Sequence, residues 1–146
     1  MNRTTTVKEG SIQRQWYVVD ATGIPVGRLA SQVAQVLRGK NKTNFAYNAD
    51  CGDFVIIINC NKAVLTGNKG DELIYWHTGY PDGLRNVSRK KLLEENSARL
   101  IEKAVWGMTP KTKLGHQIIK KLKVYPGDEH PHQAQNPIPL DVRQVR

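Results

Sequence analysis

Two short stretches of this sequence contain residue types that can do chemistry. Residues 128–132 read Asp-Glu-His-Pro-His, and a pair of histidines beside two acids can contribute to a metal site. Residues 20–27 read Asp-Ala-Thr-Gly-Ile-Pro-Val-Gly and resemble a phosphate-binding loop that leads from a strand into a helix. These stretches raise the possibilities of metal chemistry and of nucleotide binding.

Neither stretch completes a catalytic motif. A metal site would need further ligands from elsewhere in the fold, such as His77 or His116. The glycines of 20–27 match neither G-x-G-x-x-G nor a Walker loop, and a tight strand-to-helix turn explains them equally well. The spacing reveals no Ser/His/Asp or Cys/His set. We therefore predict a protein that is not an enzyme and that has no metal, cofactor or small-molecule substrate.

Basic residues are concentrated in one part of the chain. The net charge is +9, and residues 85–123 hold eleven basic and three acidic residues. Residues 108–125 contain five lysines and no acid: Lys111, Lys113, Lys120, Lys121 and Lys123. The apolar stripe of this segment should face the core, so we expect these lysines to point outward. A face of one sign costs folding stability, which favours a polyanion as partner over a merely soluble basic surface.

Folded RNA is the polyanion that fits best. No helix-turn-helix, zinc finger or RRM signature is evident, which favours binding by shape through phosphates and 2′-hydroxyls. Two more clusters are candidate contacts, one at the end of the first expected helix and one after residue 84. Their members are Arg38, Lys40 and Lys42, and Arg85, Arg89, Lys90 and Lys91. We expect His130 and His132 to hydrogen-bond to the backbone or to RNA.

Two alternatives come from other function classes. A nucleotide-dependent or metal-dependent enzyme on an α/β sheet would bind free nucleotide or contain bound metal. A basic protein of the membrane surface is less favoured, because no helix combines a bulky apolar face with exposure. The longest apolar run, 54–58, is too short to span a membrane, and residues 1–14 resemble neither a signal nor a transit peptide. We therefore predict a cytoplasmic protein with no membrane partner, in which Cys51 and Cys60 are reduced, partly buried thiols.

The elements that would position these residues alternate between strand and helix. We expect strands at 16–20, 54–59, 62–65 and 73–77, and a last strand that begins at Val124. Apolar spacing predicts a helix that Gly39 ends, and further helices at 88–95, 97–107 and 112–122. The continuous apolar run at 54–58 indicates a strand covered on both faces, as in a parallel sheet. This order predicts a single α/β domain at 14–125 with a mainly parallel sheet, an extension at 1–13, and an extended proline-containing tail at 126–146.

Several blocks of this sequence, in order, resemble a known family. The matching stretches in the first part are 16–21, 27–30, 37–42, 52–55, 66–69 (Thr-Gly-Asn-Lys) and 77–81 (His-Thr-Gly-Tyr-Pro). The second part matches at 107–108, 110–111, 114–115, 121–125 (Lys-Leu-Lys-Val-Tyr) and 130–135 (His-Pro-His-Gln-Ala-Gln). With these blocks the chain resembles the bacterial form of the universal L13 family of large-subunit ribosomal proteins.

The resemblance implies a three-layer α/β/α fold, no catalysis, and a place on the ribosome among neighbouring large-subunit proteins. It also implies direct binding of large-subunit (23S-type) ribosomal RNA and an early role in subunit assembly. It adds Lys69 and His116 to the expected RNA contacts.

Some positions depart from the family pattern. His116 stands where the family usually has Arg, and a neutral histidine cannot replace a guanidinium fork. Ala46-Tyr47-Asn48 replace a frequent Thr-Pro-His, Gly70-Asp71-Glu72 are acidic where a basic residue is common, and Asp82 replaces a usual glycine. Each departure puts one contact in doubt and leaves the resemblance standing.

Overall fold

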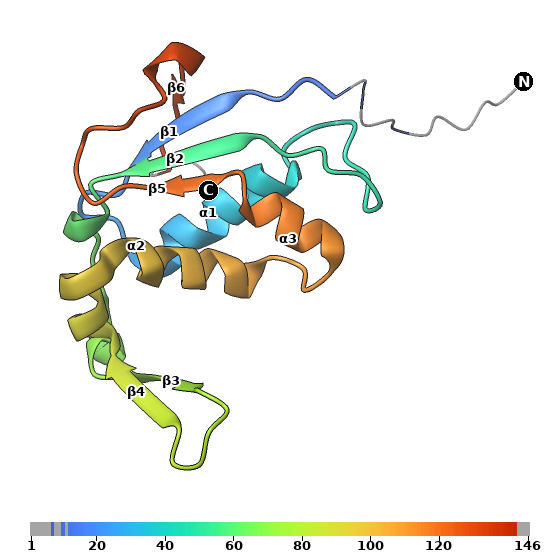
Figure 1. Cartoon of the computed structure of the whole chain (residues 1–146). Coiled ribbons are helices and arrows are strands. Elements are labelled where there is room, and N and C mark those ends of the chain that lie inside the picture. Colours follow the sequence, from blue (N-terminus) through green and yellow to red (C-terminus); the bar gives the residue numbers. More distant parts are fainter. Residues whose placement is uncertain (1–6, 8–9, 11, 143–146) are drawn as a thin grey trace, which may run out of the picture.

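A computed structural model describes residues 7, 10 and 12–142 of the chain (Figure 1). The six strands are β1 (Trp16–Asp20), β2 (Phe54–Ile58), β3 (Leu73–His77), β4 (Leu84–Ser88), β5 (Leu122–Val124) and β6 (Ile138–Pro139). The α-helices are α1 (Val26–Arg38), α2 (Arg89–Met108) and α3 (Lys113–Ile119). Three 3₁₀ turns complete the described elements: η2 (Cys60–Lys62), η3 (Gly67–Gly70) and η4 (Gln133–Gln135).

A four-stranded parallel sheet with the order β5-β2-β1-β6 forms the centre of the fold. The apolar strand β2 lies inside this sheet between β1 and β5. Its residues Val55, Ile56 and Ile57 are fully buried, because both faces of the strand are covered. The predicted α/β fold with a mainly parallel sheet is therefore confirmed.

The three α-helices lie on one side of this sheet (Figure 1). Their apolar side chains form one core with alternate residues of β1 and β2. Leu29, Leu37, Ile101 and Ile118 supply much of the helical share of this core. Gly39 ends α1 as predicted, with a φ of 79° that favours glycine.

The C-terminal tail covers the opposite side of the sheet. Side chains alternate along a strand, so Trp16 and Phe54 point away from the helical core that contains Val55. Their rings are stacked with centroids 4.3 Å apart, and the ring of His132 lies 5.2 Å from that of Trp16. The helical part of this layer is the short η4, and the tail then adds β6 to the sheet beside β1.

Four parts of the fold differ from the sequence-based prediction. The stretch 62–65 is not a strand, since it continues from η2 and makes only an isolated bridge from Val64 to Pro25. Strand β3 pairs in antiparallel fashion with β4, which we did not predict, and this hairpin projects from the body beyond α2 (Figure 1). The expected helices at 88–95 and 97–107 are one helix, α2, with a kink at Asn96. Leu122 belongs to β5 and not to the preceding helix.

Both cysteines are free, and both are fully buried where we had predicted partly buried thiols. The Cys60 Sγ lies 3.1 Å from the Ser97 Oγ, and burial raises the pKa of this thiol. Within the described residues, no helix is both long and apolar enough to cross a membrane.

Candidate nucleic-acid interface

Four of the predicted contact residues form one exposed surface around α3. The Thr112 hydroxyl caps this helix, accepting a hydrogen bond of 3.3 Å from the Gly115 amide. Positions 113, 116 and 120 are spaced i, i+3 and i+7, so they share the side of α3 that faces away from buried Ile118. We call this surface the α3 basic face, and its members are Lys111, Lys113, His116 and Lys120, all exposed.

Trp106, near the end of α2, holds two members of the α3 basic face in place. The Lys111 Nζ lies 3.9 Å from the centroid of the indole and also donates to the Trp106 carbonyl oxygen. The His116 ring packs against the same indole, with its centroid 4.7 Å from that of Trp106. A cation is attracted to the face of an indole. Sequence reasoning missed Trp106, although a tryptophan just before an acid-free lysine segment is a signal that could have found it.

Lys121 is not part of this surface, and the prediction that it points outward is wrong. It follows α3 directly and is only 5% exposed. Its ammonium pairs with the carboxylate of Asp50 and donates a hydrogen bond of 3.2 Å to the Leu37 carbonyl oxygen. Burial lowers the pKa of Lys121, and the contact with Asp50 opposes this shift. Lys121 therefore ties the end of α3 to the end of α1.

The close approach around Lys121 depends on Gly52. A Cβ atom at this position would lie 1.6 Å from the Leu37 carbonyl oxygen and 2.9 Å from the Lys121 Nζ. Arg14 reaches the same carboxylate, with its Nη2 3.6 Å from Asp50 Oδ2. The buried acid thus lies between two cations.

Lys123, His130 and His132 lie away from the α3 basic face. Lys123 is in register with Ile56 in the sheet, so its half-buried side chain points to the side that the tail covers. The His132 Nε2 lies 2.8 Å from the Tyr125 hydroxyl, and its backbone amide donates to the His130 Nδ1 at 3.3 Å. The expected hydrogen bonds of the two histidines are therefore made within the protein.

In the cluster at the end of α1, one residue is paired inside the fold and two remain for a partner. The Lys42 Nζ lies 2.6 Å from the buried Asp53 Oδ1, so its charge is neutralised inside the fold. Lys40 is exposed, and the Arg38 guanidinium lies 5.2 Å from the ring centroid of Tyr47. Tyr47 is 78% exposed, which leaves Arg38 and Tyr47 together as a surface on which a base could stack.

The third cluster lies where the β3–β4 hairpin meets α2. Arg85 is exposed on β4, opposite Trp76 in register. The Arg89 Nη2 lies 2.8 Å from Glu72 Oε2, and Lys91 pairs with Glu95 at 3.7 Å. Lys69, on η3, lines the same cleft as Arg89. Arg89 and Lys91 are thus neutralised by nearby acids, whereas Arg85, Lys90 and the neighbouring Lys69 form no salt bridge among the described residues.

The exposed cations of this arrangement can neutralise phosphates. In the part of the chain that the structure describes, no group of three or more His, Cys, Asp or Glu side chains is placed to hold a metal ion. His130 and His132 form hydrogen bonds with protein groups instead.

Comparisons with known proteins agree with this picture. A family model described as "Ribosomal protein L13" matches residues 14–131. The large ribosomal subunit protein uL13 of Kocuria rhizophila is 56% identical over 98% of this chain and 98% of its own length. The uL13 proteins of Streptomyces avermitilis and Thermobifida fusca are 53% and 51% identical, over 98% and 99% of this chain and 98% and 97% of their own lengths. The chain belongs to the ribosomal protein L13 family. This is a family of structural ribosomal proteins and not of enzymes, and the chain is of its bacterial type.

The structure shows the consequence of two departures from the L13 pattern, at Asp82 and at Glu72. Asp82 has a φ of 55°, a left-handed conformation that explains why the family usually has glycine there. Glu72, in the acidic stretch after Lys69, binds the guanidinium of Arg89. In this member of the L13 family a predicted RNA contact is therefore partly occupied by a neighbouring acid.

Proposed function

We propose that the chain is a structural component of the large ribosomal subunit that binds large-subunit (23S-type) ribosomal RNA and supports early subunit assembly. It would act in the cytoplasm, on the ribosome, next to other large-subunit proteins. Membership of the L13 family supports this proposal, and so do the names of its relatives.

The α3 basic face is the observation that carries the RNA part of the proposal. Lys111, Lys113 and Lys120 are exposed, and residues 108–125 hold no acid that could pair with them from nearby in the sequence. No salt bridge joins these three lysines to a carboxylate among the described residues. Phosphate contacts of this kind fix the position of a protein on RNA more than they read its sequence.

A binding experiment on ribosomal RNA tests the face directly. The triple variant Lys111→Ala, Lys113→Ala, Lys120→Ala should bind protein-free large-subunit RNA more weakly than the wild type. Each lost phosphate contact should reduce the slope of log K against log salt by roughly 0.7 to 0.9. Lys62→Ala, which removes an exposed lysine outside all three clusters, serves as the control. An unchanged affinity and slope in the triple variant would show that the α3 basic face is not the contact.

Fractionation of a cell lysate tests the ribosomal part. The protein should migrate with large subunits on a density gradient and remain with them after a high-salt wash. A protein that stays in the free soluble fractions at low salt would contradict the assignment.

A further inference from the structure

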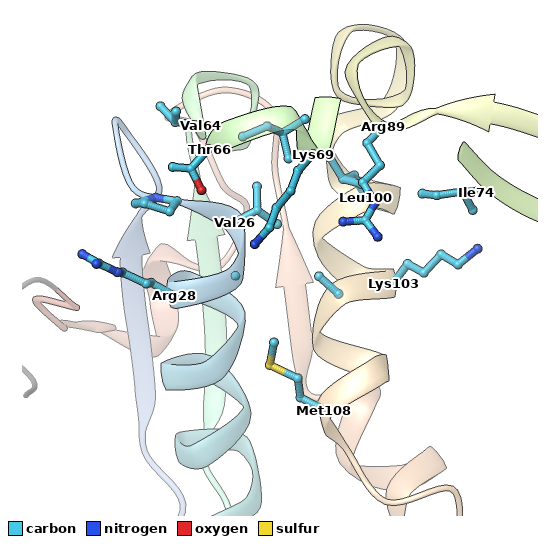
Figure 2. A pocket seen from close by; sticks show the side chains of 14 residues that line it. Val26, Arg28, Val64, Thr66, Lys69, Ile74, Arg89, Leu100, Lys103 and Met108 are labelled. Atoms are coloured by element: carbon cyan, nitrogen blue, oxygen red, sulfur yellow. The ribbon is translucent and has the colours of Figure 1, made fainter. Parts of the chain in front are cut away.

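A cleft of about 860 Å³ lies at the start of α1, between this helix and α2 (Figure 2). Its walls come from the first turn of α1, the segment from Val64 to Thr66, η3, β3 and α2. The loop at 20–27, which resembles a phosphate-binding loop in the sequence, leads directly into this wall. Only two of its lining cations, Lys69 and Arg89, are among the RNA contacts expected from the sequence.

The cleft is positively charged. Four of its lining residues are cations and none is an acid: Arg28, Lys69, Arg89 and Lys103. Figure 2 shows the Lys69 side chain extending from η3 toward the first turn of α1, and the Arg89 guanidinium turned into the same gap. Arg28 points outward, and Lys103 points toward Ile74. Among the described residues, only Arg89 of these four has a salt bridge, with Glu72.

The first turn of α1 adds backbone donors to this charge. The residue before the helix is Pro25, which makes no side-chain cap, and the first turn holds no acid. The Val26 amide donates to the Val64 carbonyl oxygen, which leaves the next amides of the turn at the cleft without a partner inside the helix. Gly27 is exposed, and a Cβ atom there would meet no atom within 4 Å, so the backbone is open to a ligand. Helix N-termini of this kind favour anions.

Apolar side chains line the rest of the cleft. Leu100 and Ala104 form its α2 wall, Met108 lies at its lower end in Figure 2, and Val64 lies across from them. Met108 is 48% exposed and Val64 is 42% exposed. A cationic end beside an apolar wall matches a nucleotide, whose phosphate is charged and whose base has apolar faces.

We propose that this cleft binds one unpaired nucleotide of the bound ribosomal RNA. Its phosphate lies among Lys69, Arg89 and the first turn of α1, and its base lies on the wall that Leu100 and Met108 form. This inference rests on the proposed function and extends it, because the α3 basic face accounts only for phosphates on the protein surface. A free nucleotide has the same chemistry, so the experiment must distinguish the two sources.

Two substitutions test the cleft without touching the core. Lys69→Glu reverses the charge of an exposed side chain, and Thr66→Trp fills the cleft from an exposed position. Each should weaken binding to protein-free large-subunit RNA roughly tenfold, and Lys69→Glu should also reduce the salt slope. The matched control is Lys62→Glu, at an exposed lysine outside the cleft, which should change affinity far less. Acetylation read by mass spectrometry should show Lys69 protected by RNA and Lys62 unprotected.

The outcomes separate this inference from the proposed function. If the wild type binds RNA and both cleft variants bind with unchanged affinity, the cleft is not a nucleotide site, and the proposed function stands. If the wild type does not bind the RNA, the proposed function fails and the inference with it. A titration with nucleoside monophosphate, followed by NMR of the Gly27 and Arg28 amides, tests whether the cleft binds a free nucleotide instead. Tight, saturable binding of the free nucleotide, with Lys69 unprotected by RNA, would overturn the assignment to RNA.

Discussion

Lys120 and Lys121 are neighbours of identical type with opposite environments. Lys120 is exposed on the α3 basic face, whereas Lys121 is buried and paired with Asp50. Asp50 is 71 residues away in the sequence. The charge run predicts a basic surface correctly, but only the tertiary contact determines which lysine of the run is inside. A lysine run therefore predicts where charge gathers and not which members of the run meet the partner.

The Lys121 pair gives a clear prediction for stability. Lys121→Ala should lower the free energy of unfolding by about 3 kcal/mol, because it leaves the Asp50 carboxylate buried with Arg14, 3.6 Å away, as its remaining cationic partner. Lys120→Ala should change it by less than about 0.5 kcal/mol, since that side chain is exposed. Urea unfolding of the two variants measures both values. Equal stability of the two variants would mean that the buried pair does not support the fold.

Asp20 gives a prediction for acid stability. The Thr22 hydroxyl donates to its carboxylate at 2.6 Å, which holds the pKa of Asp20 below the ordinary value of 3.8. A carboxyl group with a lowered pKa stabilises the fold above its unfolded pKa, and this contribution is lost as the pH falls through the folded pKa. The contribution of Asp20 should therefore be constant down to about pH 5 and disappear at more acidic pH. NMR titration should show that Thr22→Val raises the pKa toward 3.8, and a value as low as in the wild type would contradict this explanation.

At the scale of elements, the sequence predicted the helices and strands that depend on neighbouring residues, and it missed pairings between distant segments. The apolar stripe of α1, its glycine stop and the apolar run of β2 depend on neighbouring residues, and all were predicted correctly. The pairing of β6 with β1 joins Ile138 to Tyr17, and two residues of strand give no periodicity to detect. The β3–β4 hairpin was missed because the loop signal at 78–83 does not show whether β4 follows as a partner.

The kink in α2 lies at a helix cap whose residue the sequence pattern did not identify correctly. We expected Ser97 to cap the second half of this helix, but Asn96 has the non-helical conformation, with a φ of −150°. Its Oδ1 accepts a hydrogen bond of 3.0 Å from the Arg99 amide. Ser97 is instead buried against Cys60. Asparagine and serine are both good caps, so adjacent candidates cannot be separated by type alone.

This cap is testable because Asn96 is exposed. Asn96→Ala removes the acceptor for the Arg99 amide and should lower the free energy of unfolding by about 1 kcal/mol. Asn96→Asp keeps an acceptor oxygen at the same place and should stay close to the wild type. Chemical unfolding of the wild type, Asn96→Ala and Asn96→Asp measures these differences in stability. A loss of stability in the Asp variant as large as in the Ala variant would show that the side chain acts in some other way.

For the whole molecule, the described contacts divide the basic residues into those that hold the fold and those that remain for a partner. Lys42, Lys121 and Arg14 bind buried acids, so they stabilise the domain. The α3 basic face, Lys40 and the cleft cations Lys69 and Arg28 have no such partner among the described residues. These surfaces lie on α3, at both ends of α1, and on η3. With RNA bound at these surfaces, as we propose, the domain would hold separate RNA segments in a fixed relation.

That arrangement leads to a prediction for subunit assembly. Cells with less of this protein should accumulate a precursor of the large subunit, since RNA segments that the domain would join stay apart. Wild-type protein should restore mature subunits, and so should Lys62→Ala. The triple variant of the α3 basic face should restore them poorly, although its fold is intact, because its phosphate contacts are lost. Density-gradient profiles measure the ratio of precursor to mature subunit. If the triple variant restores assembly as well as the wild type, the role in assembly does not depend on this face.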